Sequence, residues 1–237
     1  MKDIILSLGG SVIYPKGGID TIFLKSFNKL VRKRVESGQR FLIVAGGGYL
    51  ANQYKEVAPQ IVSRVSKEDT DWLGVRATRL NAHLLRTIFH DIAAPTIVEH
   101  YNPIPRFGKE KVIIFAAEYP SSTTDWFLVI LAQKLKVDTV YSLLNVKMIY
   151  EKDPKRYPLS KPVYEMSWRE YRRMIGDEWY AGRQVPFDPY AARLAEQTKL
   201  TSIFLSGHDL DNFERALSGE KFVGTKIYDR SKTEDYE

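Results

Sequence analysis

The fold is decided by the stretch Phe41-Leu42-Ile43-Val44-Ala45-Gly46-Gly47-Gly48, an apolar run that ends in three glycines. The run predicts a buried strand, and the glycines leave backbone N–H groups uncovered at its end. Such groups can bind an anion that a side chain would keep away. A second run, Ile4-Ile5-Leu6-Ser7-Leu8 before Gly9-Gly10-Ser11, has the same form. Two such turns suggest two phosphate-sized subsites, although each alone is also typical of a plain tight turn.

The composition is that of a globular protein with a sizeable core. The chain has 237 residues, of which 44% are hydrophobic and 27% charged. No window approaches the roughly 20 apolar residues that a bilayer span needs, and the first residues do not resemble a signal peptide. We therefore expect a cytoplasmic protein without a membrane partner.

Cysteine and histidine usage limits the chemistry. The sequence has no cysteine, which excludes disulfides, thiolate metal sites and a cysteine nucleophile. The four histidines are scattered singly, so no zinc site is expected and no residue is assigned as a metal ligand. A catalytic metal would be a hard ion held by carboxylates and phosphates.

The formal net charge of +6 does not by itself indicate nucleic-acid binding. The basic residues are spread along the chain among 29 acids, and the densest cluster, at residues 25–34, has a helical pattern typical of a solvated face. A modest positive excess also suits anionic small molecules, because it raises their local concentration. We expect nucleotides, and no nucleic acid, as partners.

Short β-branched runs alternate with longer helical patterns. Strands are predicted at residues 3–8, 40–45, 95–98, 111–116, 139–143 and 201–205, and helices at 19–36, 49–57, 67–90, 124–135, 167–175 and 189–197. This order predicts an α/β fold with a mostly parallel sheet and helices on both sides. No repeat or linker divides the chain, so residues 1–237 are interpreted as a single domain.

Two helix starts carry acidic residues. Ser122-Thr123-Thr124-Asp125 places hydroxyls and a carboxylate at a helix N-terminus, which is compatible with an anion site and equally with a capping box. Asp188 precedes Pro189, a pairing typical of an N-cap followed by the first helical residue. Taken alone, this pattern favours a structural cap at Asp188 over a functional role.

A third acidic segment opens the helix predicted at 67–90. Asp71 lies near its start and Gly74 about one turn further, where a glycine costs roughly 1 kcal/mol relative to alanine. The carboxylate could accept hydrogen bonds from ribose hydroxyls. Alternatively, Asp71 supports the helix start and Gly74 lets another helix approach.

Taken in order, these motifs resemble the amino acid kinase family, and within it the archaeal type of UMP kinase. The matching blocks are Leu8-Gly9-Gly10-Ser11, Ala45-Gly46-Gly47-Gly48, Asp71-Trp72-Leu73-Gly74, Thr78-Arg79-Leu80-Asn81-Ala82, Pro120 to Asp125, Asn145 to Asp153, and Phe187 to Ala192. The resemblance implies a three-layer αβα sandwich with a phosphate-acceptor lobe at about 1–135 and an ATP lobe at 136–230. It also implies a homo-oligomer built from dimers, such as a hexamer, with the helix at 19–36 or 67–90 at the interface.

The resemblance also assigns roles. Asp125 and Asp188 would be catalytic and would orient the transferred phosphoryl group, with Mg²⁺ neutralising charge. ATP would contact Gly9, Gly10, Gly48, Asn145, Tyr150 and Asp153. UMP would contact Gly47, Asp71, Glu118, Tyr119, Pro120, Ser121, Ser122, Thr123 and Thr124. This division fits phosphoryl transfer, in which the protein positions two anions and stabilises spread negative charge.

Several positions depart from the family pattern. Ser7 stands where a lysine is usual, Asn52 where an arginine is usual, and Glu118 adds negative charge to the acceptor loop. Each lost cation matters, because a charge-assisted contact is typically worth about 1.5–3 kcal/mol. Lys147 and Arg183 are candidate replacements, although both are also compatible with solvated surface.

Three hypotheses follow. The first is ATP-dependent phosphoryl transfer to UMP, giving UDP. The second is a kinase of the same fold that acts on another small acidic acceptor, as the altered loop at 116–121 suggests. The third is a catalytically weak nucleotide-binding protein, which Ser7, Asn52 and Lys147 suggest.

Overall fold

The centre of the molecule is a seven-stranded sheet in the order β3-β2-β1-β4-β6-β7-β5. The computed structural model describes residues 2–100, 103–105, 107–120, 123–154, 156–178 and 185–230. Its strands are β1 (Lys2–Leu8), β2 (Gln39–Ala45), β3 (Val112–Phe115), β4 (Thr139–Leu144), β5 (Glu165–Ser167), β6 (Thr201–Ser206) and β7 (Thr225–Tyr228).

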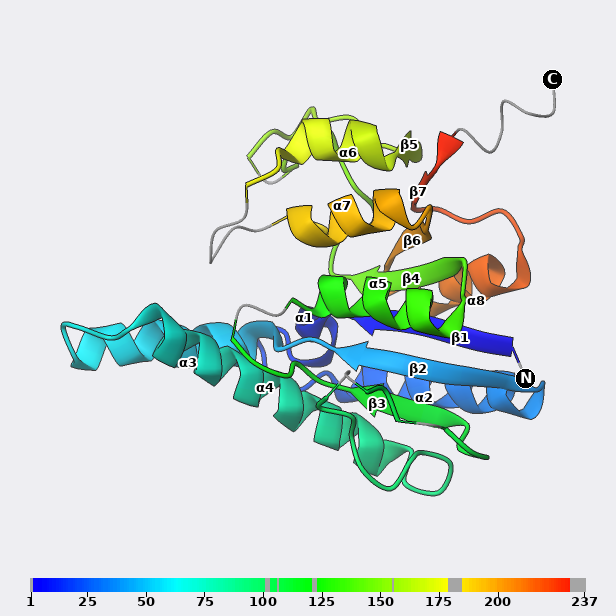
Figure 1. The fold of residues 1–237 in the computed structure, drawn as a ribbon, viewed down its shortest axis with the longest axis horizontal. Helices are drawn as coiled ribbons and strands as arrows, with labels where there is room; N and C mark the ends of the chain where they lie inside the picture. The colour runs from blue at the N-terminus through cyan, green and yellow to red at the C-terminus, as the bar shows by residue number, and fades with distance from the viewer. Residues whose placement is uncertain are drawn as a thin grey trace.

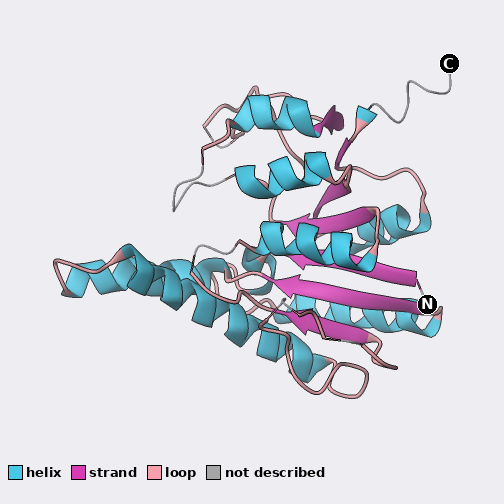
Figure 2. Ribbon diagram, in the orientation of Figure 1, coloured by secondary structure: helices cyan, strands magenta, loops and turns pink. Residues whose placement is uncertain are grey.

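Helices cover both faces of this sheet (Figures 1 and 2). They are α1 (Gly10–Ile13), α2 (Thr21–Glu36), α3 (Gly48–Ile61), α4 (Lys67–Ile88), α5 (Thr124–Leu135), α6 (Trp168–Ile175), α7 (Pro189–Gln197) and α8 (Leu210–Ser218). One apolar core joins the sheet to α2, α4 and α8, and a second joins it to α5, α6 and α7. The predicted three-layer αβα sandwich is confirmed.

The strands β3, β2, β1, β4 and β6 are all parallel, whereas β7 runs antiparallel to β6. Parallel strands covered on both faces have to be apolar along their whole length. In β1, Ile4 and Leu6 enter the first core and Ile5 enters the second, and all three are almost completely buried. The predicted mostly parallel sheet is therefore also confirmed.

The strand predicted at residues 95–98 does not form. Isolated bridges join Ala93 to Val112 and Val98 to Phe115 instead. Between them lies Pro95, which has no N–H to donate to a ladder. The short elements β5, β7 and α1, and the helix α8, were not predicted from the sequence.

Helix capping agrees with the sequence at α6 and α7. Ser167 and Glu170 form a reciprocal capping box, and Asp188 caps α7 with Pro189 as the first helical residue. At α5 the capping residue is Thr123, whose hydroxyl accepts from the N–H of Trp126. Ser122, part of the predicted start, lies outside the described residues.

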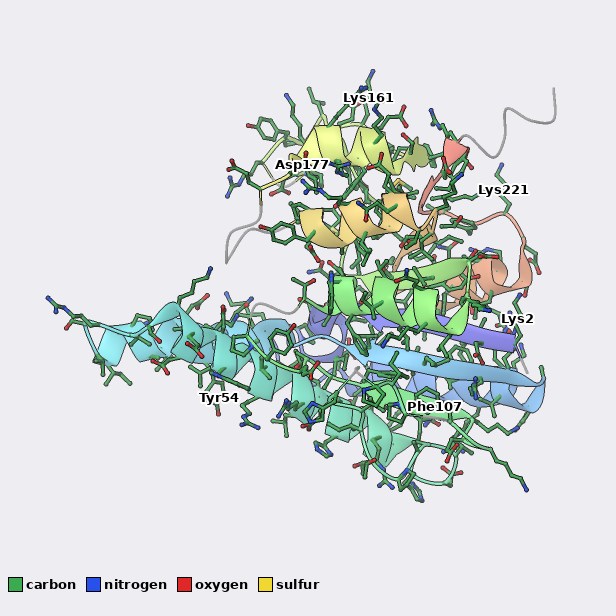
Figure 3. All side chains as sticks on the ribbon, viewed as in Figure 1. Lys2, Tyr54, Phe107, Lys161, Asp177 and Lys221 are labelled. Atoms are coloured by element: carbon green, nitrogen blue, oxygen red, sulfur yellow. The ribbon has the colours of Figure 1, made fainter. Side chains whose placement is uncertain are left out.

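Helices α3 and α4 pack against each other and extend together beyond the sheet (Figure 1). Tyr54, labelled in Figure 3, belongs to α3 and marks this extension. Within the described ranges, no helix is both long enough and apolar enough to cross a bilayer.

Parallel strands end at one common edge, where their connecting turns meet. Figure 2 shows the strand arrows pointing to this edge, where α3, α5 and α7 begin. The two glycine turns and both acidic helix starts of the sequence analysis lie here, so the edge is the candidate site.

Candidate functional site

The two glycine turns pack backbone against backbone. A Cβ on Gly10 would lie 1.9 Å from the N atom of Gly48, and a Cβ on Gly46 would lie 2.4 Å from the N atom of Gly10. Gly48 also has φ +65°, a conformation that side chains disfavour. Glycine is therefore required by turn-on-turn packing, in addition to any role in exposing N–H groups.

Some of the N–H groups in these turns are already bonded. Gly9 donates to the carbonyl of Leu143 at 2.9 Å, and Gly46 donates to that of Leu8 at 3.0 Å. These bonds anchor each turn to the sheet. The first turn of a helix leaves backbone N–H groups without intrahelical partners. In α3 one of these, the N–H of Tyr49, donates to the carbonyl of Tyr14. Because α3 begins at the glycine turn, the positive end of its dipole lies there.

The heads of α5 and α7 are joined through two carboxylates. The backbone N–H of Asp188 donates to Oδ2 of Asp125 at 3.1 Å. The Thr123 hydroxyl donates to Oδ2 of Asp188, and the N–H of Ala191 donates to Oδ1 at 2.9 Å. Thr123 thus caps α5 and also binds Asp188, the residue that caps α7. This network places the predicted catalytic pair, Asp125 and Asp188, side by side.

Buried aromatic side chains fix the approach to Asp188. The hydroxyl of Tyr171, on α6, donates to the carbonyl of Phe187 and accepts from its N–H, each at 2.8 Å. Tyr171 and Phe187 are completely buried, and Phe187 packs against Trp168 and Phe204. The backbone before Asp188 is therefore rigidly positioned.

Desolvation raises the pKa of both carboxyl groups. Desolvation, followed by repulsion from Asp188, raises the pKa of Asp125 well above its ordinary value. Desolvation also raises the pKa of Asp188, against hydrogen bonds from Thr123, Ala191 and Tyr190 that lower it. Two neighbouring acids that repel each other, with Asp188 buried and Asp125 half-buried, favour partial protonation or a cationic ligand.

The wall beside the glycine turn is formed by matching stripes of α3 and α4. Gly47, Ala51 and Lys55 recur every four residues on α3 and face α4. A Cβ on Gly47 would contact both Ala51 and Thr78, and Asn81 donates to the carbonyl of Gly47 at 3.2 Å.

Across this wall, Lys55 reaches Asp71. A Cβ on Gly74 would lie 2.5 Å from Cε of Lys55 and 2.8 Å from its Nζ, so the lysine stem passes over the glycine. Nζ ends 3.4 Å from Oδ1 of Asp71. Gly74 is thus small because a side chain of the neighbouring helix lies on it.

The predicted acceptor loop is held by Arg79 of α4. Its guanidinium donates to the carbonyls of Ala117 and Glu118 at 3.2 and 2.8 Å, and it pairs with Glu99 at 3.0 Å. The Glu118 carboxylate lies 3.1 Å from Nδ1 of His100. The negative charge of Glu118 is therefore held beside an imidazole at the loop.

The predicted adenosine positions lie in the loop after β4. Asn145 and Asp153 are exposed, and Tyr150 is half-buried and bridges to Pro162. The segment is anchored by Ile149, which is buried and donates its N–H to the Thr225 hydroxyl at 2.9 Å. Two of the three predicted side chains, Asn145 and Asp153, are therefore exposed beside an anchored backbone.

The structure brings most predicted residues to one edge. Gly9, Gly10, Gly47, Gly48, Asp125 and Asp188 meet at the strand ends, and Asp71 lies beside them on α4. Thr123 and Thr124 stand at the head of α5, and Glu118, Tyr119 and Pro120 precede it. Ser121, Ser122 and the candidate cation Arg183 lie outside the described residues.

Sequence reasoning missed four residues of this site: Lys55, Thr78, Arg79 in its loop-holding role, and Asn81. The available signal was spacing, since positions 71, 74, 78 and 81 recur on one face of a helix. Within the part of the chain that the structure describes, no group of three or more acidic, histidine or cysteine side chains could hold a metal ion.

Known proteins are similar to this chain over most of its length. The uridylate kinase of Methanoregula boonei is 30% identical over 209 residues, which cover 87% of each chain. That of Methanoculleus marisnigri is 30% identical over 239 residues and covers 98% of each chain. The solved uridylate kinase of Archaeoglobus fulgidus superposes with a TM-score of 0.77 at 28% identity, over 96% of this chain and all of the other.

The family comparison covers most of the chain and includes the sheet edge described above. Residues 2–206 match the amino acid kinase family, which accounts for every strand of the parallel part of the sheet. The resemblance found in the sequence is thereby confirmed. The chain belongs to the amino acid kinase family.

Proposed function

We propose that this protein transfers the γ-phosphoryl group of ATP to UMP, giving UDP and ADP. A phosphate oxygen of UMP forms the new bond to phosphorus while the bond from phosphorus to the bridging oxygen of ADP breaks. The relatives named uridylate kinase support UMP as the acceptor. Two phosphate-sized turns at one edge are what a reaction between two nucleotides requires.

The observation that carries the proposal is the joined pair of Asp125 and Asp188. Asp188 is only 5% exposed, and both carboxylates stand at helix heads on the sheet edge that carries the glycine turns. Placing two acids side by side with little solvent is costly unless a positive ligand or a proton accompanies them. A site meant only for capping would not need the second carboxylate.

These residues fit a magnesium ion carried by the nucleotide. Mg²⁺ is usually held by one or two carboxylates together with substrate phosphates, rather than by a cage of protein ligands. Asp125 and Asp188 supply two carboxylates. When bound, the ion would neutralise phosphate charge during transfer. The protein's own residues orient the two phosphates through the head of α3 and the glycine turns.

The nucleotides divide between two sides of the edge. In the proposal, residues 1–135 form the acceptor lobe, with UMP between Gly47, Asp71 and the loop at 118–124. Residues 136–230 form the ATP lobe, in which Asn145, Tyr150 and Asp153 take the adenosine. Gly9, Gly10 and Gly48 serve the ATP phosphates. The family resemblance also supports a homo-oligomer.

A second acceptor class has one observation in its favour. Glu118 brings a carboxylate to the loop that should receive an anion, and it lies 3.1 Å from Nδ1 of His100. Repulsion between this carboxylate and a phosphate favours a less charged acceptor. UMP remains the proposal, because Lys55 and the head of α3 supply positive charge to the same wall.

The test is a coupled measurement of ADP release with ATP and Mg²⁺ against UMP, CMP, other monophosphates and small carboxylic acids. UDP should be identified directly by chromatography, and UMP should give the highest kcat/KM. Turnover with another acceptor alone would move the protein to the second class. ATP binding without transfer to any acceptor would instead indicate a nucleotide-binding protein.

A further inference from the structure

We propose that Lys55 binds the phosphate of the acceptor nucleotide and thereby supplies the charge that Asn52 cannot. This inference rests on the proposed function and names the residue that makes the acceptor site select a nucleotide over a nucleoside. Nothing in the sequence pattern alone distinguishes Lys55 from the other lysines of the chain.

The packing of α3 determines which of its polar residues faces the site. Gly47, Ala51 and Lys55 form the stripe against α4, and Ala51 is buried there. Asn52 lies one position off this stripe and is exposed. The inward polar position of α3 is therefore residue 55, one helical turn beyond the place where the family usually carries arginine.

The lysine head is held next to the acceptor turn. The stem of Lys55 lies over Gly74, and the carbonyl of Gly74 is 3.6 Å from where a Cβ of Gly47 would be. Gly74 thus lies next to both the lysine head and the turn. A long, flexible side chain at this place can reach a phosphate bound at Gly47 without any movement of the backbone.

The contact that holds Lys55 is weak enough to exchange. Its Nζ lies 3.4 Å from Oδ1 of Asp71, at the long end for a charged hydrogen bond, and 38% of the lysine side chain is exposed. An ammonium group has three donors, so this one contact does not saturate it. Half-exposed pairs of this kind contribute little by themselves.

Other cations on α4 are engaged elsewhere. Arg79 donates to the carbonyls of Ala117 and Glu118 and pairs with Glu99. Arg76 lies over the ring of Trp72, 5.4 Å from its centroid. Lys55 is instead paired with a carboxylate, that of Asp71, which is itself predicted to bind the acceptor.

Exchange of partners gives the pair a function. When the phosphate of the acceptor arrives, Lys55 turns from Asp71 to the phosphate. The carboxylate of Asp71 is then free to accept hydrogen bonds from the ribose hydroxyls. One movement of a side chain therefore prepares both halves of the acceptor site, and a nucleoside without phosphate cannot trigger it.

The experiment compares the dissociation constants of UMP and uridine by calorimetry for wild type, Lys55→Met, Lys55→Arg and Lys29→Met. Methionine keeps an unbranched stem over Gly74 and removes the charge. Lys29 is an exposed lysine of α2, so Lys29→Met removes the same charge elsewhere. Thermal unfolding checks that every variant is folded.

We expect Lys55→Met to weaken UMP about 10- to 100-fold, the range of one charge-assisted contact, and not to weaken uridine, because Asp71 is then free of its lysine. Lys55→Arg should retain most of the affinity, and Lys29→Met should bind as wild type does. The double variant Asn52→Arg, Lys55→Met should recover part of the loss. Equal losses for UMP and uridine, or no loss for UMP, would overturn the inference.

Failure of the two proposals can be told apart. If wild type converts UMP to UDP and Lys55→Met binds UMP normally, the function stands and the role of Lys55 is refuted. If wild type binds UMP through Lys55 but forms no UDP, the role of Lys55 stands and the kinase activity is refuted. Wild type that does not bind UMP refutes both.

Discussion

The buried carboxylates at the heads of α5 and α7 and the Lys55–Asp71 pair between α3 and α4 hold negative charge in opposite ways. Asp188 is 5% exposed and is fixed by Thr123 and Ala191. The Asp71 side chain is 16% exposed and has one long contact to a flexible lysine. The first arrangement is rigid, and the second can exchange its partner.

This difference separates two tasks of one site. A centre for phosphoryl transfer gains from charges that need no reorganisation during the reaction. An acceptor wall has to admit and release a nucleotide, so weaker contacts suit it. Substitutions in the centre should therefore have large effects, and substitutions in the wall should have graded effects on affinity.

The largest effect is expected from Asp188→Asn. Asparagine also caps helices, so the fold should persist while kcat falls about 100- to 1,000-fold, the cost of losing one charged group aimed at the reacting phosphates. Steady-state rates with UMP and ATP measure the loss. The matched control is Asp209→Asn, which alters the cap of α8. An Asp188→Asn variant whose kcat lies within fivefold of the wild-type value would show that Asp188 does not take part in phosphoryl transfer.

The packing of the glycine turns gives the second prediction. Gly10→Ala should lower the free energy of unfolding by about 1–3 kcal/mol, because its methyl group would collide with the backbone of Gly48. Chemical denaturation measures the change. Gly17→Ala is the control, since nothing lies within 4 Å of a Cβ there. Equal stability of the two variants would mean that the turns do not pack tightly.

The raised pKa of Asp125 gives the third prediction. Because desolvation raises the pKa of folded Asp125, the folded protein binds more protons than the unfolded chain above pH 3.8. The contribution of Asp125 to stability is therefore present at low pH and is lost as pH rises through its folded pKa. Wild type should lose stability relative to Asp125→Asn by up to about 1.4 kcal/mol per pH unit in this range.

Denaturation of both proteins between pH 4 and pH 7 measures this difference. Asp91 provides a contrast of opposite sign, since a hydrogen bond from Arg32 lowers its pKa to about 2. Its contribution is present at neutral pH and is lost as pH falls. Parallel stability curves for wild type and Asp125→Asn would show that folding does not raise the pKa of Asp125.

The smallest effect is expected from Arg79→Met in the wall. Loss of its hydrogen bonds to Ala117 and Glu118 should loosen the acceptor loop and raise the KM for UMP about three- to tenfold, with kcat little changed. Arg76→Met is the control on the same helix. A fall in kcat as large as that of Asp188→Asn would contradict the division between centre and wall.

Local sequence signals predicted the parts of the molecule that depend on near neighbours. The strand and turn at Phe41 to Gly48 and the cap of α7 at Asp188 were predicted from adjacent residues. The strand expected at 95–98 failed because Pro95 interrupts an otherwise apolar run. The loop at 121–122 lies outside the described residues, so the predicted contacts of Ser121 and Ser122 stay predictions.

The neighbour of Gly74 could not be predicted from local sequence. The sequence allowed either a ligand or another helix beside it, and the structure places the stem of Lys55 there. No local rule connects residues 55 and 74, because they belong to different helices. Which faces of α3 and α4 meet depends on how both pack.

The sequence by itself determined the alternation of strand and helix, the glycine turns and the helix caps, because these follow from backbone freedom and from hydrogen bonds over a few residues. The tertiary structure decided which charges meet. Asp125 and Asp188 are 63 positions apart, and Lys55 and Asp71 are 16 apart on different helices. The first contact arises because a parallel sheet gathers its strand ends at one edge, and the second because α3 packs against α4; no single segment can specify either.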